Sequence, residues 1–155
     1  MIDSNYIKID KLSLPNVSRE TLKHLEEYSN AILLENKRVN LISKSTEKSI
    51  KIRHIKDTAQ TIEFIDKNDI KTCTDIGSGA GLPGIVLGIL MKAKKPEFKV
   101  IFYEKSFHKS NFLKEMTKKF YLNSEIYRRN IFNEKNLVTD VIISRAFKPL
   151  PIIFQ

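Results

Sequence analysis

The chain has 155 residues, the size of one typical domain, and its 27 lysines and arginines exceed its 18 acidic residues to give a formal charge of +9. This basic excess is compatible with a polyanionic partner or with lysines that only solvate the surface. Cys73 is the only cysteine, which excludes an internal disulfide and a multi-cysteine zinc site. No apolar run approaches the ~20 residues that span a bilayer, and the first residues lack the segments of a signal peptide. The sequence therefore predicts a cytoplasmic protein that binds no metal and no membrane.

The N-terminal part of the chain shows helical periodicity. Pro15 and Ser18 precede apolar residues at helical spacing, which predicts a helix over residues 18–37. Residues 40–43 interrupt this pattern, and a second helical period after Thr46 predicts one further helix with a basic side. Its apolar positions are Ile50, Ile55, Ala59, Ile62 and Ile65. We interpret residues 1–68 as a helical cap.

From Ile70 onward, short apolar strands alternate with helical segments, which is the order of βαβ units. The expected strands are 71–76, 98–103, 124–128 and 139–144, and the expected helices are 82–94 and 107–121. Residues expected to face inward are Leu82, Ile85, Val86, Ile89 and Leu90 in the first helix and Phe107, Phe112, Leu113, Met116 and Phe120 in the second. This pattern predicts an α/β fold with an open parallel sheet, in which Cys73 is a small buried filler.

The strongest local signal is the segment 75–84, Asp-Ile-Gly-Ser-Gly-Ala-Gly-Leu-Pro-Gly, which follows the first strand and opens a helix. Glycines permit a tight turn and let a ligand approach the backbone. Because open α/β sheets bind ligands at the carboxyl ends of their strands, we predict a cofactor pocket here. The alternative is a glycine-rich turn that only tightens the corner between strand and helix.

The residues around this turn favour one cofactor over another. Gly79, Gly81 and Gly84 formally satisfy the dinucleotide fingerprint, so a nicotinamide-dependent oxidoreductase is an alternative. However, Asp75 stands two residues before Gly77, which resembles the acid-x-Gly-x-Gly-x-Gly motif of class I methyltransferases. A carboxylate suits the positive sulfonium and ammonium groups of S-adenosyl-L-methionine and would repel a pyrophosphate. Glu104 can accept the ribose hydroxyls, or it is an ordinary helix-capping carboxylate before Ser106.

Further motifs occur in a fixed order: Asn40-Leu-Ile42, Arg53-His54-x-x-Asp57-Thr58, the glycine-rich segment 75–85, and Ser144-Arg145-Ala146. Together they resemble the 16S ribosomal RNA guanine-N7 methyltransferase family, also called glucose-inhibited division protein B, from about residue 25 to 150. The resemblance implies a class I S-adenosylmethionine methyltransferase with a Rossmann-like parallel sheet, whose core is residues 69–155 within one structural domain. It also implies ribosomal RNA or the small ribosomal subunit as partner.

The resemblance also implies roles for single residues. It assigns the cofactor to Asp75, Gly77, Gly79, Gly81, Leu82, Glu104, Asn130, Ile131 and Arg145, and substrate positioning to Ser144, Arg145, Arg53 and His54. The family usually has an acid where this chain has Ile131, so the adenine contact there is expected from backbone atoms. Alternatively, His54 and Asp57 interact with each other, and Arg145 forms an ion pair. No catalytic acid or base is expected, because guanine N7 carries a free lone pair.

The resemblance implies a chain truncated at its C-terminus. The family continues past Ser144-Arg145-Ala146, so the fifth to seventh strands are expected to be missing after Gln155. An inactive remnant or an RNA-binding module is therefore an alternative function. A complete chain is expected to be a monomer, whereas an exposed sheet edge and the apolar residues 150–154 would favour association. The basic segment from Lys92 to Lys119 is expected either to contact phosphates or to form a solvated face.

Overall fold

The computed structural model describes residues 14, 16–145 and 148–153 of the chain. The first helix, α1 (Arg19–Glu35), begins at Ser18, whose side chain accepts a hydrogen bond from the N–H of Thr21 at 3.1 Å. The remaining elements are, in chain order, α2 (Lys44–Glu47), the π-helix η3 (Lys51–Lys56), α3 (Asp57–Ala59), α4 (Ile62–Lys67), β1 (Thr72–Ile76), α5 (Gly84–Met91), β2 (Lys99–Tyr103), α6 (Phe107–Lys119), β3 (Ser124–Tyr127), the 3-10 helix η4 (Ile131–Asn133), β4 (Val141–Ser144) and α7 (Leu150–Ile153).

Within the described residues the strands form a four-stranded parallel sheet in the order β3-β2-β1-β4. The predicted α/β fold and all four predicted strands are thereby confirmed. The chain moves outward from β1 to β3 and then returns to the other side of β1, so the strand order reverses between β1 and β4. In such sheets ligands bind outside the carboxyl ends of the strands at this point of reversal. These ends are Ile76 and Ser144, which are paired in the sheet.

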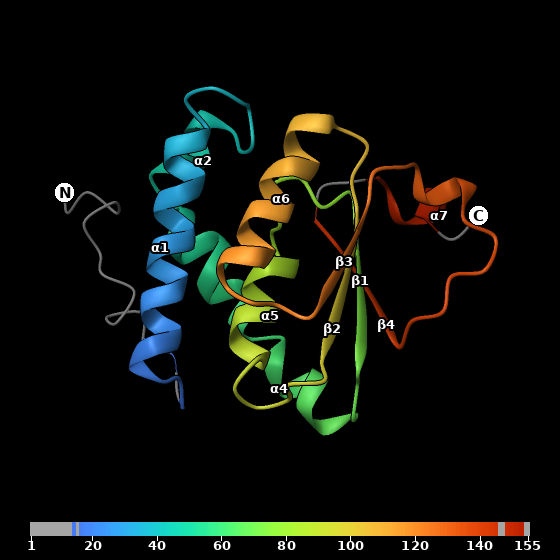
Figure 1. Ribbon diagram of the computed structural model, residues 1–155, viewed down its shortest axis with the longest axis horizontal. Coiled ribbons are helices and arrows are strands. Elements are labelled where there is room, and N and C mark those ends of the chain that lie inside the picture. Colours follow the sequence, from blue (N-terminus) through green and yellow to red (C-terminus); the bar gives the residue numbers. More distant parts are fainter. Residues whose placement is uncertain (1–13, 15, 146–147, 154–155) are drawn as a thin grey trace.

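Helices α1, α5 and α6 lie on one side of the sheet, with α5 in contact with both of the others (Figure 1). Every residue of α5 is buried, because the helix lies between the sheet and α1. Leu25, Tyr28 and Ile32 of α1 are fully buried and belong to the same apolar core as the strands. Burying a side chain of this size contributes about 1.5–3 kcal/mol, so the helical cap is held by the core that it covers.

The prediction of a single second helix after Thr46 is wrong. The structure has the π-helix η3 followed directly by α3, a turn at residues 60–61, and then α4. The hydroxyl of Thr58 donates to the carbonyl of His54 at 2.5 Å, and the hydroxyl of Thr61 donates to the carbonyl of Thr58 at 2.7 Å. Threonine side chains that bond to the preceding turn compete with the helical ladder, which explains the interruption.

The inward-facing residues of α5 and α6 are confirmed, with Phe107 as the exception. Its side chain is 55% exposed. A helix advances about 100° per residue, which puts Phe107 on the opposite side of α6 from Phe112, Met116 and Phe120. Cys73 is fully buried, as expected, and burial raises the pKa of its thiol. Among the described residues no helix is long and apolar enough to cross a membrane.

Candidate functional site

The glycine-rich loop between β1 and α5 is fixed by hydrogen bonds to the neighbouring strand. The N–H groups of Gly77 and Ser78 both donate to the carbonyl of Tyr103, at 3.0 and 3.2 Å. The N–H of Gly79 donates to Oε2 of Glu104 at 2.8 Å. Gly77 and Gly79 have φ values of +68° and +56°, a conformation that L side chains rarely adopt. The conformation of the turn itself therefore requires glycine at positions 77 and 79.

The loop is also held from the helical cap by Tyr28 of α1. The Tyr28 hydroxyl donates to the carbonyl of Ala80 at 2.8 Å, and both residues are buried. Burial raises the pKa of Tyr28 well above its ordinary value, and the nearby Asp75 carboxylate raises it further, so the hydroxyl keeps its proton. Sequence analysis did not identify this contact, because the helical pattern of α1 indicates burial but not which group the hydroxyl meets.

Cavities lie on both sides of this loop, and Gly77 and Gly79 line both of them. The first, here called the Glu104 cavity, has a volume of about 170 Å³ and is lined by Gly77, Gly79, Tyr103, Glu104, Lys105, Lys109, Arg129, Asn130 and Ile131. The second, here called the His54 cavity, has a volume of about 350 Å³ and is lined by Leu41, Ile42, Ser43, Thr46, His54, Gly77, Ser78, Gly79, Ala80, Leu82 and Arg145. A Cβ atom added at Gly79 would be 3.9 Å from its nearest neighbour, the Gly77 carbonyl oxygen. The backbone therefore has open space beside it.

Glu104 both lines its cavity and supports the loop. Its Oε2 accepts from the N–H of Gly79, and its Oε1 accepts from the N–H of Ser106 at 2.8 Å. Each carboxylate oxygen has a second lone pair, so these bonds leave acceptor capacity for a ligand. Asn130 and Ile131 line the same cavity, as the resemblance implies. The cofactor role of these three residues stays a prediction.

His54 and Arg145 come together in the second cavity. His54 is only 6% exposed, and among the described residues neither of its ring nitrogens has a hydrogen-bond partner. Burial and then the nearby Arg145 charge lower its pKa to about 4, against a raising effect of Asp57. The imidazole is therefore neutral at pH 7 and offers one donor and one acceptor. Arg145 donates through Nη1 to the carbonyl of Arg53 at 3.0 Å, and this chain of contacts links the end of β4 to η3.

Asp75 lines neither cavity, and its role in cofactor binding stays a prediction. Its side chain is fully buried, and its Oδ2 accepts from the N–H of Gly84 at 2.9 Å. Burial raises its pKa to about 7, with the Gly84 bond lowering it and Glu104 raising it again. A Cβ atom at Gly84 would lie 2.5 Å from Oδ2 of Asp75, so the glycine is what allows this approach. The carboxylate supports the first turn of α5.

Three other predicted residues do not line either cavity. A Cβ atom at Gly81 would lie 2.2 Å from Cγ1 of Ile85, so this glycine serves packing of the loop on α5. Ser144 is exposed, and its hydroxyl donates to the carbonyl of Ile76 at 3.4 Å. Arg53 is exposed, and its backbone carbonyl accepts the hydrogen bond from Arg145. Ala146, the last residue of the quoted motif, lies outside the described residues, as does Phe154.

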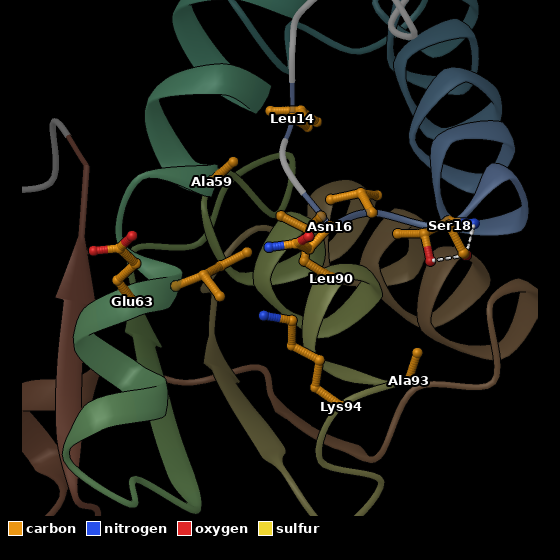
Figure 2. A pocket seen from close by; sticks show the side chains of 11 residues that line it. Leu14, Asn16, Ser18, Ala59, Glu63, Leu90, Ala93 and Lys94 are labelled. Atoms are coloured by element: carbon orange, nitrogen blue, oxygen red, sulfur yellow. Dashed lines mark hydrogen bonds between the residues drawn. The ribbon is translucent and has the colours of Figure 1, made fainter.

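A further cavity of about 180 Å³ lies away from the glycine-rich loop (Figure 2). It is formed where the start of α1 meets residues 59–63 and the end of α5, and it is lined by Leu90 of α5 and by Ala93 and Lys94, which follow that helix. None of its lining residues belongs to the loop or to the cavities beside it. Among the described residues, no three His, Cys, Asp or Glu side chains cluster as a metal site would require.

Comparison with known proteins identifies the family. The family model of GidB, rRNA small subunit methyltransferase G, matches residues 21–155. The chain belongs to this family. Proteins named ribosomal RNA small subunit methyltransferase G from Pelagibacter ubique, Cereibacter sphaeroides and Rickettsia akari are 48%, 39% and 37% identical to it over 142, 135 and 140 residues. These alignments cover 90%, 87% and 90% of this chain.

The chain spans about two thirds of the length of these relatives, with 66%, 64% and 69% of them covered. Family membership supports the expected methyltransferase ancestry and the α/β fold. The Glu104 cavity is also lined by residues that were not among those predicted to bind the cofactor. Tyr103, Lys105, Lys109 and Arg129 line the Glu104 cavity. Lys105 follows the second strand and Lys109 lies in the first turn of α6, and both belong to the basic segment from Lys92 to Lys119.

Proposed function

We propose that this chain provides the S-adenosylmethionine site of a methyltransferase that acts on guanine N7 of small-subunit ribosomal RNA. One observation carries the proposal. Two cavities at the carboxyl end of β1 share a wall of bare backbone at Gly77 and Gly79. An elongated ligand with a nucleoside at one end and an amino acid at the other can extend from one cavity into the other along this backbone without meeting a side chain. The family of the chain supports the same ligand.

The chemistry of each cavity fits one end of this donor. In the Glu104 cavity, the remaining lone pairs of the Glu104 carboxylate suit ribose hydroxyls, and Asn130 and Ile131 suit the adenine ring. In the His54 cavity, the Arg145 guanidinium suits the carboxylate of the amino acid end. Asp75, buried behind the loop, holds the start of α5 in place. It acts on the ligand through the position of the loop.

The donor, when bound, supplies a methyl group made electrophilic by a sulfonium centre. Guanine N7 carries a free lone pair, so no residue of this chain would have to remove a proton. The residues beside the His54 cavity therefore act by position. His54 is neutral at pH 7, which avoids a further positive charge beside the sulfonium. Leu41, Ala80 and Leu82 give the cavity apolar walls. Orientation of reactants in this way contributes on the order of several kcal/mol to catalysis.

Titration calorimetry with S-adenosylmethionine and with NAD tests the cofactor assignment. We expect binding of the methyl donor and none of NAD. Gly79→Ala would place a methyl group in the open space beside the loop, at a φ of +56° that L side chains rarely adopt, and is expected to weaken donor binding at least about tenfold. Glu104→Gln is expected to weaken it as well, with Glu63→Gln in the separate cavity of Figure 2 as the matched control. Binding of NAD in place of the donor would contradict the proposal.

Transfer is tested with labelled donor and undermethylated small ribosomal subunits, followed by mapping of the modified base. The relative from Pelagibacter ubique provides the positive control. Label at N7 of a guanine supports the proposed reaction. Donor binding with no transfer to RNA, under conditions where the relative is active, would limit the chain to the cofactor site.

A further inference from the structure

The basic segment from Lys92 to Lys119 divides in the structure into a neutralised part and an unpaired part. Pairs with carboxylates are Lys94–Asp66 at 3.0 Å, Lys95–Asp69 at 3.9 Å, Lys119–Glu27 at 3.5 Å and Lys99–Glu125. Lys94, Lys95 and Lys99 lie before β2 or at its start, at the amino ends of the strands. Among the described residues, Lys105 and Lys109 form no ion pair, and both line the Glu104 cavity at the carboxyl ends. Lys92, Lys114 and Lys118 form no ion pair in the described part of the chain either, and Lys105 and Lys109 are the unpaired lysines of this segment that line the cavity.

An exposed aromatic ring lies next to these lysines. Phe107, the first residue of α6, is 55% exposed. The guanidinium of Arg128 lies over its ring, with Cζ 5.4 Å from the centroid. Arg128 is itself exposed and forms no ion pair within the described part of the chain, whereas its neighbour Arg129 is paired with Glu134.

The combination of a stacking platform with unpaired cations is characteristic of surfaces that bind single-stranded nucleic acid. Bases stack on aromatic rings and on guanidinium planes, while lysines contact the phosphates. We propose that Phe107, Arg128, Lys105 and Lys109 form a docking surface for single-stranded RNA on the rim of the Glu104 cavity. This inference rests on the proposed function, and it names the face of the protein against which the RNA substrate lies. Here this set is called the Phe107 surface.

The test measures the affinity of the full chain for a fluorescently labelled, single-stranded fragment of small-subunit ribosomal RNA at several salt concentrations. Phe107→Leu keeps an apolar side chain but removes the ring, and it is expected to weaken binding at least about fivefold. Phe107→Tyr keeps the ring and is expected to bind like the original chain. The Arg128 guanidinium can contact a phosphate as well as stack on a base, so Arg128→Gln is expected to weaken binding and to reduce the slope of log affinity against log salt by about 0.7, the value for one phosphate contact on a single strand.

Lys114→Gln provides the matched control for charge. Lys114 is exposed on α6 and has no ion pair within the described residues, so its loss changes the net charge equally. We expect an unchanged salt slope. Equal effects of Lys114→Gln and Arg128→Gln, or full affinity of Phe107→Leu, would overturn the proposal. A competition experiment gives a further outcome that would overturn the proposal. If a polyglutamate peptide displaces the labelled RNA as effectively, per unit charge, as unlabelled RNA does, the surface suits an acidic protein instead.

The same variants are titrated with S-adenosylmethionine. Phe107 and Arg128 do not line the Glu104 cavity, so donor affinity is expected to stay unchanged. If the chain binds the donor but the variants do not change its affinity for RNA, the Phe107 surface is refuted and the proposed function stands. Loss of RNA affinity in the variants of a chain that binds no donor supports the surface and refutes the proposed cofactor site.

Discussion

The hydrogen bond from Tyr28 to Ala80 gives a prediction that is independent of any ligand. Tyr28→Phe removes only the hydroxyl and leaves the buried ring in place. A buried hydrogen bond contributes about 0.5–1.5 kcal/mol net, and an acceptor left without a partner costs about 1–3 kcal/mol. The Ala80 carbonyl belongs to a residue that is 4% exposed, so water does not readily replace the hydroxyl. We expect a loss of about 1–3 kcal/mol in the free energy of unfolding.

Urea unfolding followed by circular dichroism measures this loss, and the melting temperature is expected to fall by roughly 3–10 °C for a chain of this size. Tyr121→Phe is the control, since Tyr121 is 81% exposed and the same atom is removed. It is expected to unfold within about 0.5 kcal/mol of the original chain. If both variants unfold alike, the contact between α1 and the loop contributes nothing to stability and the reasoning fails.

Gly81→Ala is expected to cost more stability than Gly79→Ala, because its Cβ would lie 2.2 Å from Ile85 whereas the nearest atom to a Cβ at Gly79 is 3.9 Å away. Urea unfolding compares them, and equal losses would contradict the packing role of Gly81. Asp75 has a pKa of about 7 in the fold against 3.8 ordinarily, so protonation favours the fold and stability falls as pH rises from about 4 to 7. Asp75→Asn is expected to remove this loss, which has an upper limit of about 4 kcal/mol, and unfolding at pH 5 and pH 8 checks it. His54 acts in the opposite direction, since its pKa of about 4 against 6.5 makes stability fall as pH drops from about 6.5 to 4. His54→Gln is expected to reduce this sensitivity to acid, and an unchanged acid limb in the unfolding profile would show that the fold does not lower the pKa of the imidazole.

The strands and the two helices of the core could be predicted because their signals are local. Apolar runs such as 98–103 and the period of α6 follow directly from side-chain burial on one face. The glycine-rich loop was recognisable because its backbone requires positive φ at Gly77, Gly79 and Gly81. The second helix was mispredicted, since apolar spacing does not show how Thr58 and Thr61 interrupt the helical ladder.

The site was less predictable where contacts join distant segments. Asp75 was expected to meet a ligand because acid and glycine are adjacent in sequence, but the pleat of β1 turns its side chain toward Gly84. Tyr28 lies 52 positions from Ala80, and no local pattern connects them. Arg145 and His54 were assigned to substrate by resemblance, and the structure brings both to one cavity. Their function there stays a prediction.

The burial of α1 against α5 has a consequence for dissecting this protein into parts. Leu25, Tyr28 and Ile32 fill space that the sheet layer alone leaves open, and Lys51 of η3 is anchored to Glu26 at 2.5 Å. An N-terminal deletion would strip α5 of its outer cover and free the carbonyl of Ala80. Fragments that begin near residue 69 are therefore expected to aggregate, and the minimal unit for binding studies includes α1.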